Sequence, residues 1–182
     1  MVTLALALGF WLASLVFTGF AAGSAFATLR ELDLYVPRYD AAPSGHSRLA
    51  GGHVVEPIFV LRDVVQAACA VVASGALAFS RRSLHGPARI VTIGCVTIAA
   101  LLVLTKLVGL NPRMNADLDS IRAAIAAGDL DAAQAPRERF DRMHPIASLV
   151  LVLTAANVLI ASMSLLWTSM KGVRHGPQRK RP

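Results

Sequence analysis

The fold class is decided by residues 2–29, whose sequence is VTLALALGFWLASLVFTGFAAGSAFATL and contains no charged side chain. An α-helix needs about 20 consecutive apolar residues to cross the hydrocarbon core of a bilayer. No water is available in that core, so the helix must satisfy its backbone N–H and C=O groups internally. The stretch therefore predicts a transmembrane helix.

A cleaved signal peptide is the alternative interpretation of the same stretch. Residues 25–27, Ala-Phe-Ala, resemble a cleavage site. However, no basic segment precedes the apolar run, and the run is longer than the roughly 7–15 residues of a signal-peptide core. A retained first helix is therefore favoured, and cleavage stays open as the alternative.

Three further segments have a similar apolar character, at about residues 57–79, 88–110 and 145–170. Hydrophobic residues form 55% of the chain and charged residues only 16%, whereas soluble domains carry about 25% charged residues. We therefore expect an all-α integral membrane protein, a four-helix bundle over residues 1–170 followed by a basic tail at 171–182.

The basic residues predict how the bundle lies in the membrane. With four spans, the N-terminus, the 80–89 loop and the tail share one side, and that side carries no acidic residue. Its basic residues are Arg81, Arg82, Arg89, Lys171, Arg174, Arg179, Lys180 and Arg181. The loops of the opposite side carry as many Lys and Arg residues, but these are spread over longer segments. Because short cytoplasmic segments are enriched in Lys and Arg, the denser side is predicted to be cytoplasmic, with both termini, in a bacterial inner membrane. Attraction to anionic lipid also accounts for the net charge of +7, so the lipid bilayer is the expected partner and nucleic acid is not.

Two long loops are then expected on the opposite side. Residues 30–53 contain several prolines and glycines and are predicted to be irregular. Residues 111–144 are predicted to form an amphipathic helical loop, because one apolar stripe runs through Met114, Leu118, Ile121 and Ile125.

The boundaries of this helical loop are predicted from capping residues. Asn115 is a candidate N-cap, and Gly128 is a candidate C-terminal stop. A second short helix is expected to start near Pro136 and to continue into the fourth span.

Gly19 and Gly23 form a GxxxG motif in the first span. Small residues at this spacing let a second helix approach closely. The motif predicts helix packing, either against a neighbouring span of the same chain, which is the commoner case, or in a homodimer.

Four polar residues are placed inside the predicted spans: Arg62, Asp63, Lys106 and Asn157. Ionisable groups are costly in hydrocarbon, so each needs a partner or a route to water. Lys106 is expected either to neutralise Asp63 or Glu56 inside the bundle, or to extend with Arg62 to the membrane surface. Pairing would imply a polar cavity that opens away from the cytoplasm. Asn157 is expected to bond between helices.

A metal site is the alternative interpretation of the histidines. His53 and Glu56 are three residues apart, which on a helix places both on one face. His144 begins the fourth span at a similar predicted depth, so the three side chains are candidate ligands for copper, iron or haem. However, the sequence contains no HxxxH, CxxC or CxxCH motif, and no cofactor is expected.

Three stretches carry a resemblance to a known family: residues 11–29 (WLASLVFTGFAAGSAFATL), 111–114 (NPRM) and 140–144 (FDRMH). They resemble the small four-span membrane proteins that include transmembrane protein 205 and its bacterial relatives. The resemblance implies a four-helix membrane domain without an established molecular activity, whose eukaryotic relatives are associated with drug resistance and secretory traffic. It transfers no catalytic residue, and His144 is the one polar position it marks. The 36–53 loop and the Arg62/Asp63 pair do not match the family pattern.

The sequence favours a non-enzymatic membrane protein that assists transport, envelope stress or the assembly of a partner complex. The alternative is a membrane redox or metal-handling protein that uses His53, Glu56 and His144. No GxSxG, GxGxxG or P-loop motif occurs. A membrane-embedded enzyme would require a polar pocket, for which Asp63 and Lys106 are the candidates.

Overall fold

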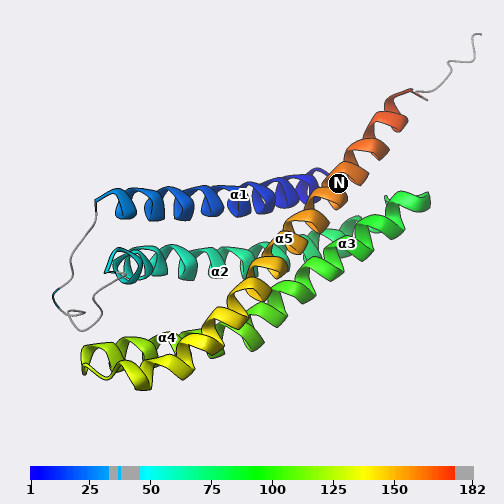
Figure 1. Cartoon of the computed structure of the whole chain (residues 1–182). Helices are drawn as coiled ribbons and strands as arrows, with labels where there is room; N and C mark the ends of the chain where they lie inside the picture. Colours follow the sequence, from blue (N-terminus) through cyan, green and yellow to red (C-terminus); the bar gives the residue numbers. More distant parts are fainter. Residues whose placement is uncertain (33–36, 38–45, 175–182) are drawn as a thin grey trace, which may run out of the picture.

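The computed structural model describes residues 1–32, 37 and 46–174, which form a helical bundle (Figure 1). Its elements are α1 (Val2–Glu31), α2 (His46–Ser80), α3 (Gly86–Thr105), the π-helix η2 (Lys106–Leu110), α4 (Asn111–Ala126) and α5 (Leu130–Arg174). In this part of the chain four stretches are long and apolar enough to cross a membrane: Val2–Glu31, Gly51–Ser80, Gly86–Ala126 and Leu130–Thr168. The predicted all-α fold with four spanning helices is confirmed.

The bundle consists of two helix pairs. α1 lies beside α2, and α3 lies beside α5 (Figure 1). The buried positions of α1, which include Leu4, Leu8, Trp11 and Leu15, recur every three or four residues and so share one face. That face packs into a single apolar core with residues of α2, α3 and α5.

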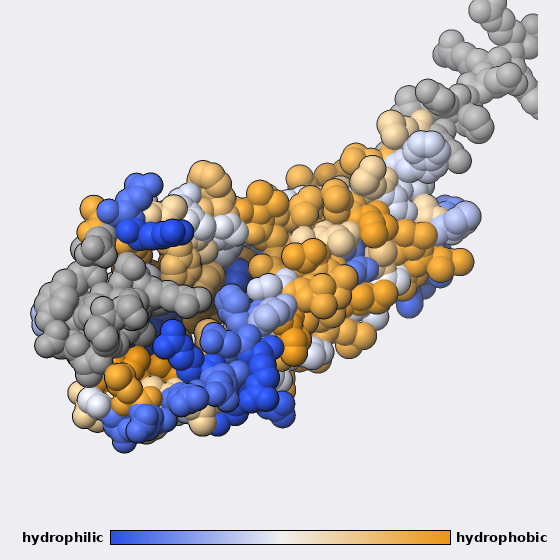
Figure 2. Space-filling model, viewed as in Figure 1, coloured by the Kyte–Doolittle hydropathy of each residue, from blue (hydrophilic) through white to orange (hydrophobic). Residues whose placement is uncertain are grey.

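The outer surface of the spans is apolar rather than polar. Large side chains such as Phe20, Val71, Ile90 and Leu166 are more than half exposed. Figure 2 shows hydrophobic surface over the spans, while most of the hydrophilic surface lies at the end that carries α4 and the start of α5, with smaller hydrophilic areas elsewhere. Apolar patches of this extent are unfavourable in water and are what a bilayer accommodates, so the chain is a multi-pass membrane protein.

Two of the helical stretches, Gly86–Ala126 and Leu130–Thr168, are much longer than a bilayer requires. At 1.5 Å per residue, the 41 residues of Gly86–Ala126 extend about 62 Å, twice the roughly 30 Å of hydrocarbon. α4 and the first part of α5 form a helical hairpin (residues 111–144), and we call the end of the bundle that carries it the hairpin end. The opposite end, with the 81–85 turn, is called the turn end.

The hairpin is closed by a tight turn. Gly128 has a φ of 78°, a conformation that glycine adopts without strain, and the N–H of Asp129 bonds to the carbonyl of Ala124. The Asp129 carboxylate in turn accepts the N–H of Ala132 at 2.9 Å and so caps α5. Ile121, Ile125 and Ala133 form a separate small core.

Several predicted boundaries are wrong. Residues 46–53, predicted to be irregular, form the first turns of α2. Here glycine permits packing rather than a turn, because a Cβ on Gly51 would lie 2.8 Å from the ring of Phe26. The second span therefore begins earlier than residue 57, and residues 33–36 and 38–45 lie outside the described residues.

The loop between the third and fourth spans also differs in its boundaries. Asn115 caps nothing, because α3, η2 and α4 are continuous and Asn115 lies inside α4. The next helix begins at Leu130 rather than near Pro136, since Asp129 caps it there. Gly128 ends α4 as predicted. Of the predicted tail, residues 171–174 continue α5, and residues 175–182 lie outside the described residues.

Candidate functional site

The main polar feature inside the bundle is an ion cluster of Arg62, Asp63, Lys106 and Asn111. Asp63 of α2 is its centre. Its Oδ1 accepts Lys106 Nζ at 2.6 Å and Arg62 Nη2 at 2.8 Å, and its Oδ2 accepts Asn111 Nδ2 at 2.6 Å. The contacts to Lys106 and Asn111 link the α1/α2 pair to the α3/α5 pair.

The π-helix η2 explains why two residues of one helix reach the same carboxylate. Lys106 and Asn111 are five residues apart, and on a regular α-helix they would point about 140° apart. In η2 the N–H of Asn111 bonds to the carbonyl of Lys106, an i→i+5 bond that defines a π-turn. This wider turn brings both side chains back onto one face. Such π-turns are frequent at functional sites.

The ion cluster is largely withdrawn from the surface. The side chains of Arg62, Asp63 and Lys106 are only 12%, 16% and 10% exposed. Lys106 follows the 20 residues of α3, and so lies about 30 Å along the helix from the turn end, near the far boundary of a hydrocarbon core. Of the two alternatives, pairing or extension to the surface, the structure shows pairing.

Arg62 is held on a second side by an aromatic ring. Its guanidinium carbon lies 4.8 Å from the ring centroid of Phe59, within the range of a cation–π contact. Because Asp63 and Phe59 both hold Arg62, its position is determined from both sides.

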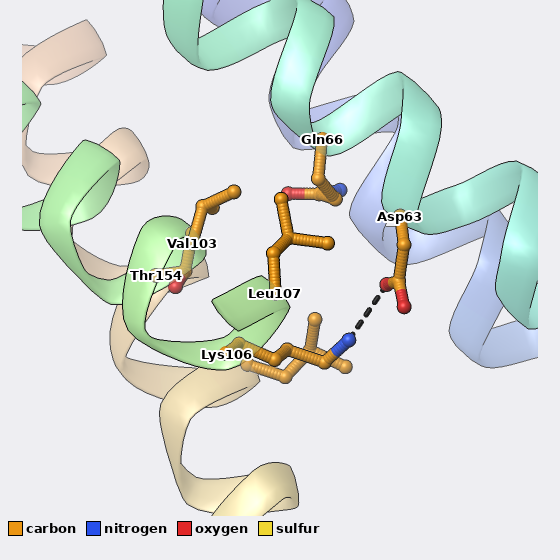
Figure 3. Close-up of a pocket in the computed structure, with 7 residues that line it drawn as sticks. Asp63, Gln66, Val103, Lys106, Leu107 and Thr154 are labelled. Carbon is orange, nitrogen blue, oxygen red and sulfur yellow. Dashed lines mark hydrogen bonds and ion pairs between the residues drawn. The ribbon is translucent and has the colours of Figure 1, made fainter. Parts of the chain in front are cut away.

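A small cavity adjoins the ion cluster (Figure 3). It has room for about one water molecule, about 10 Å³, far less than a substrate pocket. Its lining residues are Asp63, Gln66, Val103, Lys106, Leu107, Leu151 and Thr154.

Gln66 connects this cavity to α1. Its Oε1 accepts the indole N–H of Trp11, and its Nε2 lies 3.4 Å from Ser14 Oγ. Trp11 is fully buried and Gln66 is 4% exposed. The indole N–H can only donate, so the amide oxygen of Gln66 must face Trp11.

Further ion pairs hold the hairpin. Arg122 of α4 contacts Glu56 of α2 at 2.8 Å, and Arg139 of α5 contacts the buried Asp117 of α4 at 2.7 Å. Glu56 therefore pairs with Arg122, not with Lys106. Together with the ion cluster, these contacts fasten the hairpin to α2 and close it upon itself.

The three candidate metal ligands are placed as follows. Glu56 is engaged by Arg122, His144 stacks on Phe140 with ring centroids 5.7 Å apart, and His53 is exposed on α2. Among residues 1–32, 37 and 46–174 no group of three or more His, Cys, Asp or Glu side chains is arranged to hold a metal ion. The metal site stays a prediction without geometric support.

The structure differs from the sequence prediction at the GxxxG motif and at Asn157. Gly19 and Gly23 are exposed, and a Cβ on either would meet nothing within 4 Å. They therefore do not pack against a span of the same chain, and a homodimer stays a prediction. Asn157 donates to the carbonyl of Leu153 in its own helix at 2.8 Å, so it joins no second helix and no part of the ion cluster.

Sequence reasoning missed three residues of this site: Trp11, Asn111 and Arg122. Gln66 lies one helical turn after Asp63, which places it on the same face. Asn111 carried no such signal, because it lies five residues after Lys106 and only the π-turn brings the two side chains onto one face.

The chain matches no protein-family profile, no curated protein and no solved structure. The resemblance to the transmembrane protein 205 family is therefore neither supported nor opposed, and it stays a prediction.

Proposed function

We propose that this chain is a non-enzymatic protein of a bacterial inner membrane that assists the assembly of a partner complex through its hairpin. The observation that carries the proposal is the length, outer polarity and internal bonding of the hairpin, residues 111–144. They extend beyond the length needed to cross a bilayer, and they are polar on the outside and fixed internally (Figure 2). A projecting element of this kind provides a contact surface for another protein.

The rigidity of the hairpin supports this role. Its two helices are joined by a capped turn, by the core around Ile121 and Ile125, and by the Asp117–Arg139 pair. Arg122 then ties α4 to α2 through Glu56. A surface that is held in place before binding loses less conformational entropy when a partner docks.

The chemistry of the ion cluster also favours a structural role. Both carboxylate oxygens of Asp63 already accept hydrogen bonds from charged or amide donors. A carboxylate so engaged is poorly placed to act as a general base, which must reach the proton that it removes.

The charge distribution supports an orientation with the hairpin end in the periplasm. The turn end carries Arg81, Arg82 and Arg89, all exposed, and no acidic residue between positions 80 and 89. Basic residues of short loops remain in the cytoplasm. Both termini would then be cytoplasmic.

Photo-crosslinking in living cells tests the proposal. A photoreactive amino acid replaces Asp119, which is 76% exposed on the hairpin, or Ile90, which is 75% exposed on α3 and serves as the matched lipid-facing control. We expect a reproducible adduct with one other protein at position 119 and no protein adduct at position 90. Absence of an adduct at 119, or an adduct with a second copy of this chain, contradicts assembly with another protein.

The redox alternative has a separate test. A Soret band or stoichiometric copper in the purified protein, lost in a His144→Ala variant, would replace this proposal with a metal-handling function.

A further inference from the structure

Asn157 of α5 carries a carboxamide whose hydrogen-bonding groups are only partly satisfied. One N–H of its Nδ2 donates to the carbonyl of Leu153 at 2.8 Å. A carboxamide has two N–H donors and an acceptor oxygen, and within residues 1–32, 37 and 46–174 this side chain makes no further hydrogen bond. One N–H and the oxygen Oδ1 are therefore without a partner in the described part of the chain.

These unpaired groups lie deep in the hydrocarbon. The nearest ionisable residues along the sequence are His144, 13 residues before Asn157, and Lys171, 14 residues after it. Both are about 20 Å from Asn157 along the helix, farther than the roughly 15 Å between the middle and the edge of a hydrocarbon core. Bulk water does not reach that depth, so an unpaired amide there is strongly unfavourable.

Gln66 shows how the bundle treats a carboxamide that it encloses. It is 4% exposed, its Oε1 accepts the indole N–H of Trp11, and its Nε2 donates to Ser14 Oγ at 3.4 Å. Asn157 is instead partly exposed on the outside of the bundle. Within the described residues no side chain of another helix bonds to it. The contrast indicates that the partner of Asn157 comes from outside the chain.

The surroundings of Asn157 on α5 have the spacing of a helix-pairing surface. Leu153 and Ile160, the neighbours one turn before and after Asn157, are 42% and 48% exposed. Alternating steps of four and three residues extend this pattern along the span, as in the contact face of left-handed helix pairs. We call this set of seven residues, none of which is buried, the Asn157 face: Ile146, Val150, Leu153, Asn157, Ile160, Ser164 and Trp167.

A second copy of this chain presents the matching chemistry. A two-fold axis along the membrane normal places both Asn157 side chains at the same depth. The unpaired N–H of each can then donate to the unpaired Oδ1 of the other, whereas a lipid tail offers neither group. From this geometry we propose that the chain forms a parallel homodimer through the Asn157 face, joined by reciprocal hydrogen bonds between the two carboxamides.

This inference goes beyond the proposed assembly function and does not depend on it, because it concerns the spans and not the hairpin. It assigns the dimer contact to α5 rather than to the GxxxG motif of α1. A polar side chain at one contact position of a helix pair also fixes the register of the two helices.

Disulfide cross-linking in native membranes tests the position of the contact, in a chain whose Cys69 and Cys95 are replaced by alanine. Leu153→Cys and Ile160→Cys lie on the Asn157 face. Val152→Cys and Leu159→Cys are the matched controls, since they are 63% and 46% exposed and lie one residue away but about 100° around the helix. We expect oxidation to give cross-linked dimers at positions 153 and 160 in several-fold higher yield than at 152 and 159.

Substitution of Asn157 tests the carboxamide itself. Energy transfer between labelled copies of the purified full-length protein, measured against the protein-to-detergent ratio, gives the dissociation constant of the dimer. Asn157→Leu should raise that constant about five- to thirtyfold, the effect of losing interhelical hydrogen bonds in a membrane. Asn157→Gln keeps a carboxamide and should retain the dimer, and Gly23→Val on α1 should leave the constant unchanged.

The variants remain informative because Asn157 bonds only within its own helix, so Asn157→Leu should fold as a monomer with an unchanged Tm. A wild type that is monomeric at every protein-to-detergent ratio overturns the proposal. So does a dimer that Asn157→Leu leaves intact, a dimer that Gly23→Val abolishes, or equal cross-linking at all four cysteine positions. Cross-links from position 153 to a different protein would also overturn it, since the Asn157 face would then bind a helix of that protein.

Discussion

Asp63 and Lys106 form one ion pair, but we expect their removal to have unequal effects on stability. Lys106→Leu leaves Asp63 bonded to Arg62 at 2.8 Å and to Asn111 at 2.6 Å. The loss is then about one charged hydrogen bond, about 1.5–3 kcal/mol. Asp63→Leu instead leaves two cations with side chains only 10% and 12% exposed, and breaking a buried pair in this way costs about 3–5 kcal/mol.

The expected difference of about 2 kcal/mol corresponds to a factor of about 30 in the unfolding equilibrium constant. It can be measured by reversible unfolding in mixed detergent micelles with increasing denaturing detergent. The double variant Asp63→Leu/Lys106→Leu completes a double-mutant cycle that isolates the pair. Equal losses for both single variants, or losses below about 0.5 kcal/mol, would refute the argument that Asp63 is the centre of the ion cluster.

Three further predictions concern backbone positions. Deleting Val108, which is 70% exposed, should convert η2 to a regular α-helical turn. Lys106 and Asn111 would then be four positions apart and would still share one face of the helix. The free energy of unfolding should therefore change by less than about 1 kcal/mol. Gly51→Val should destabilise the protein by about 1–3 kcal/mol, because its Cβ meets the ring of Phe26, whereas Gly23→Val should be neutral in the monomer. Gly128→Val should cost about 1–2 kcal/mol, because its φ of 78° disfavours a β-branched residue.

The same unfolding assay checks these predictions. Deleting Ala116, inside α4, is the control for the Val108 deletion, because it rotates Ile121 by about 100° relative to α3; similar losses for both deletions would show that η2 is not a one-residue insertion. Equal costs at Gly51 and Gly23 would contradict the α1–α2 packing. A neutral Gly128→Val would contradict the hairpin turn.

The four spans could be predicted because hydropathy over about 20 residues is a local property of the chain. The pairing of Lys106 with Asp63 could be expected as one of two alternatives, since charges in hydrocarbon need partners. What decided between them was the contact between α2 and η2, which depends on how the two helix pairs meet. Local sequence does not contain that information.

Other contacts were missed for specific physical reasons. The partner of Glu56 is Arg122, outside the spans, and only the continuity of α3, η2 and α4 brings it over α2. The glycines at 51 and 52 suggested a turn, although a buried glycine equally serves close helix packing. The GxxxG motif suggested packing within the chain, but Trp11 and Leu15 define the buried face of α1, and Gly19 lies off it.

The central claim is that α3 crosses the membrane, so that the turn end and the hairpin lie on opposite sides. Single cysteines at Ser83 and Asp119, both exposed, can be introduced after Cys69 and Cys95 are replaced by alanine, and treated with a membrane-impermeant thiol reagent in intact spheroplasts. We predict that position 119 reacts at once and position 83 only after the membrane is permeabilised. Reaction of both positions from the same side would contradict a four-span bundle.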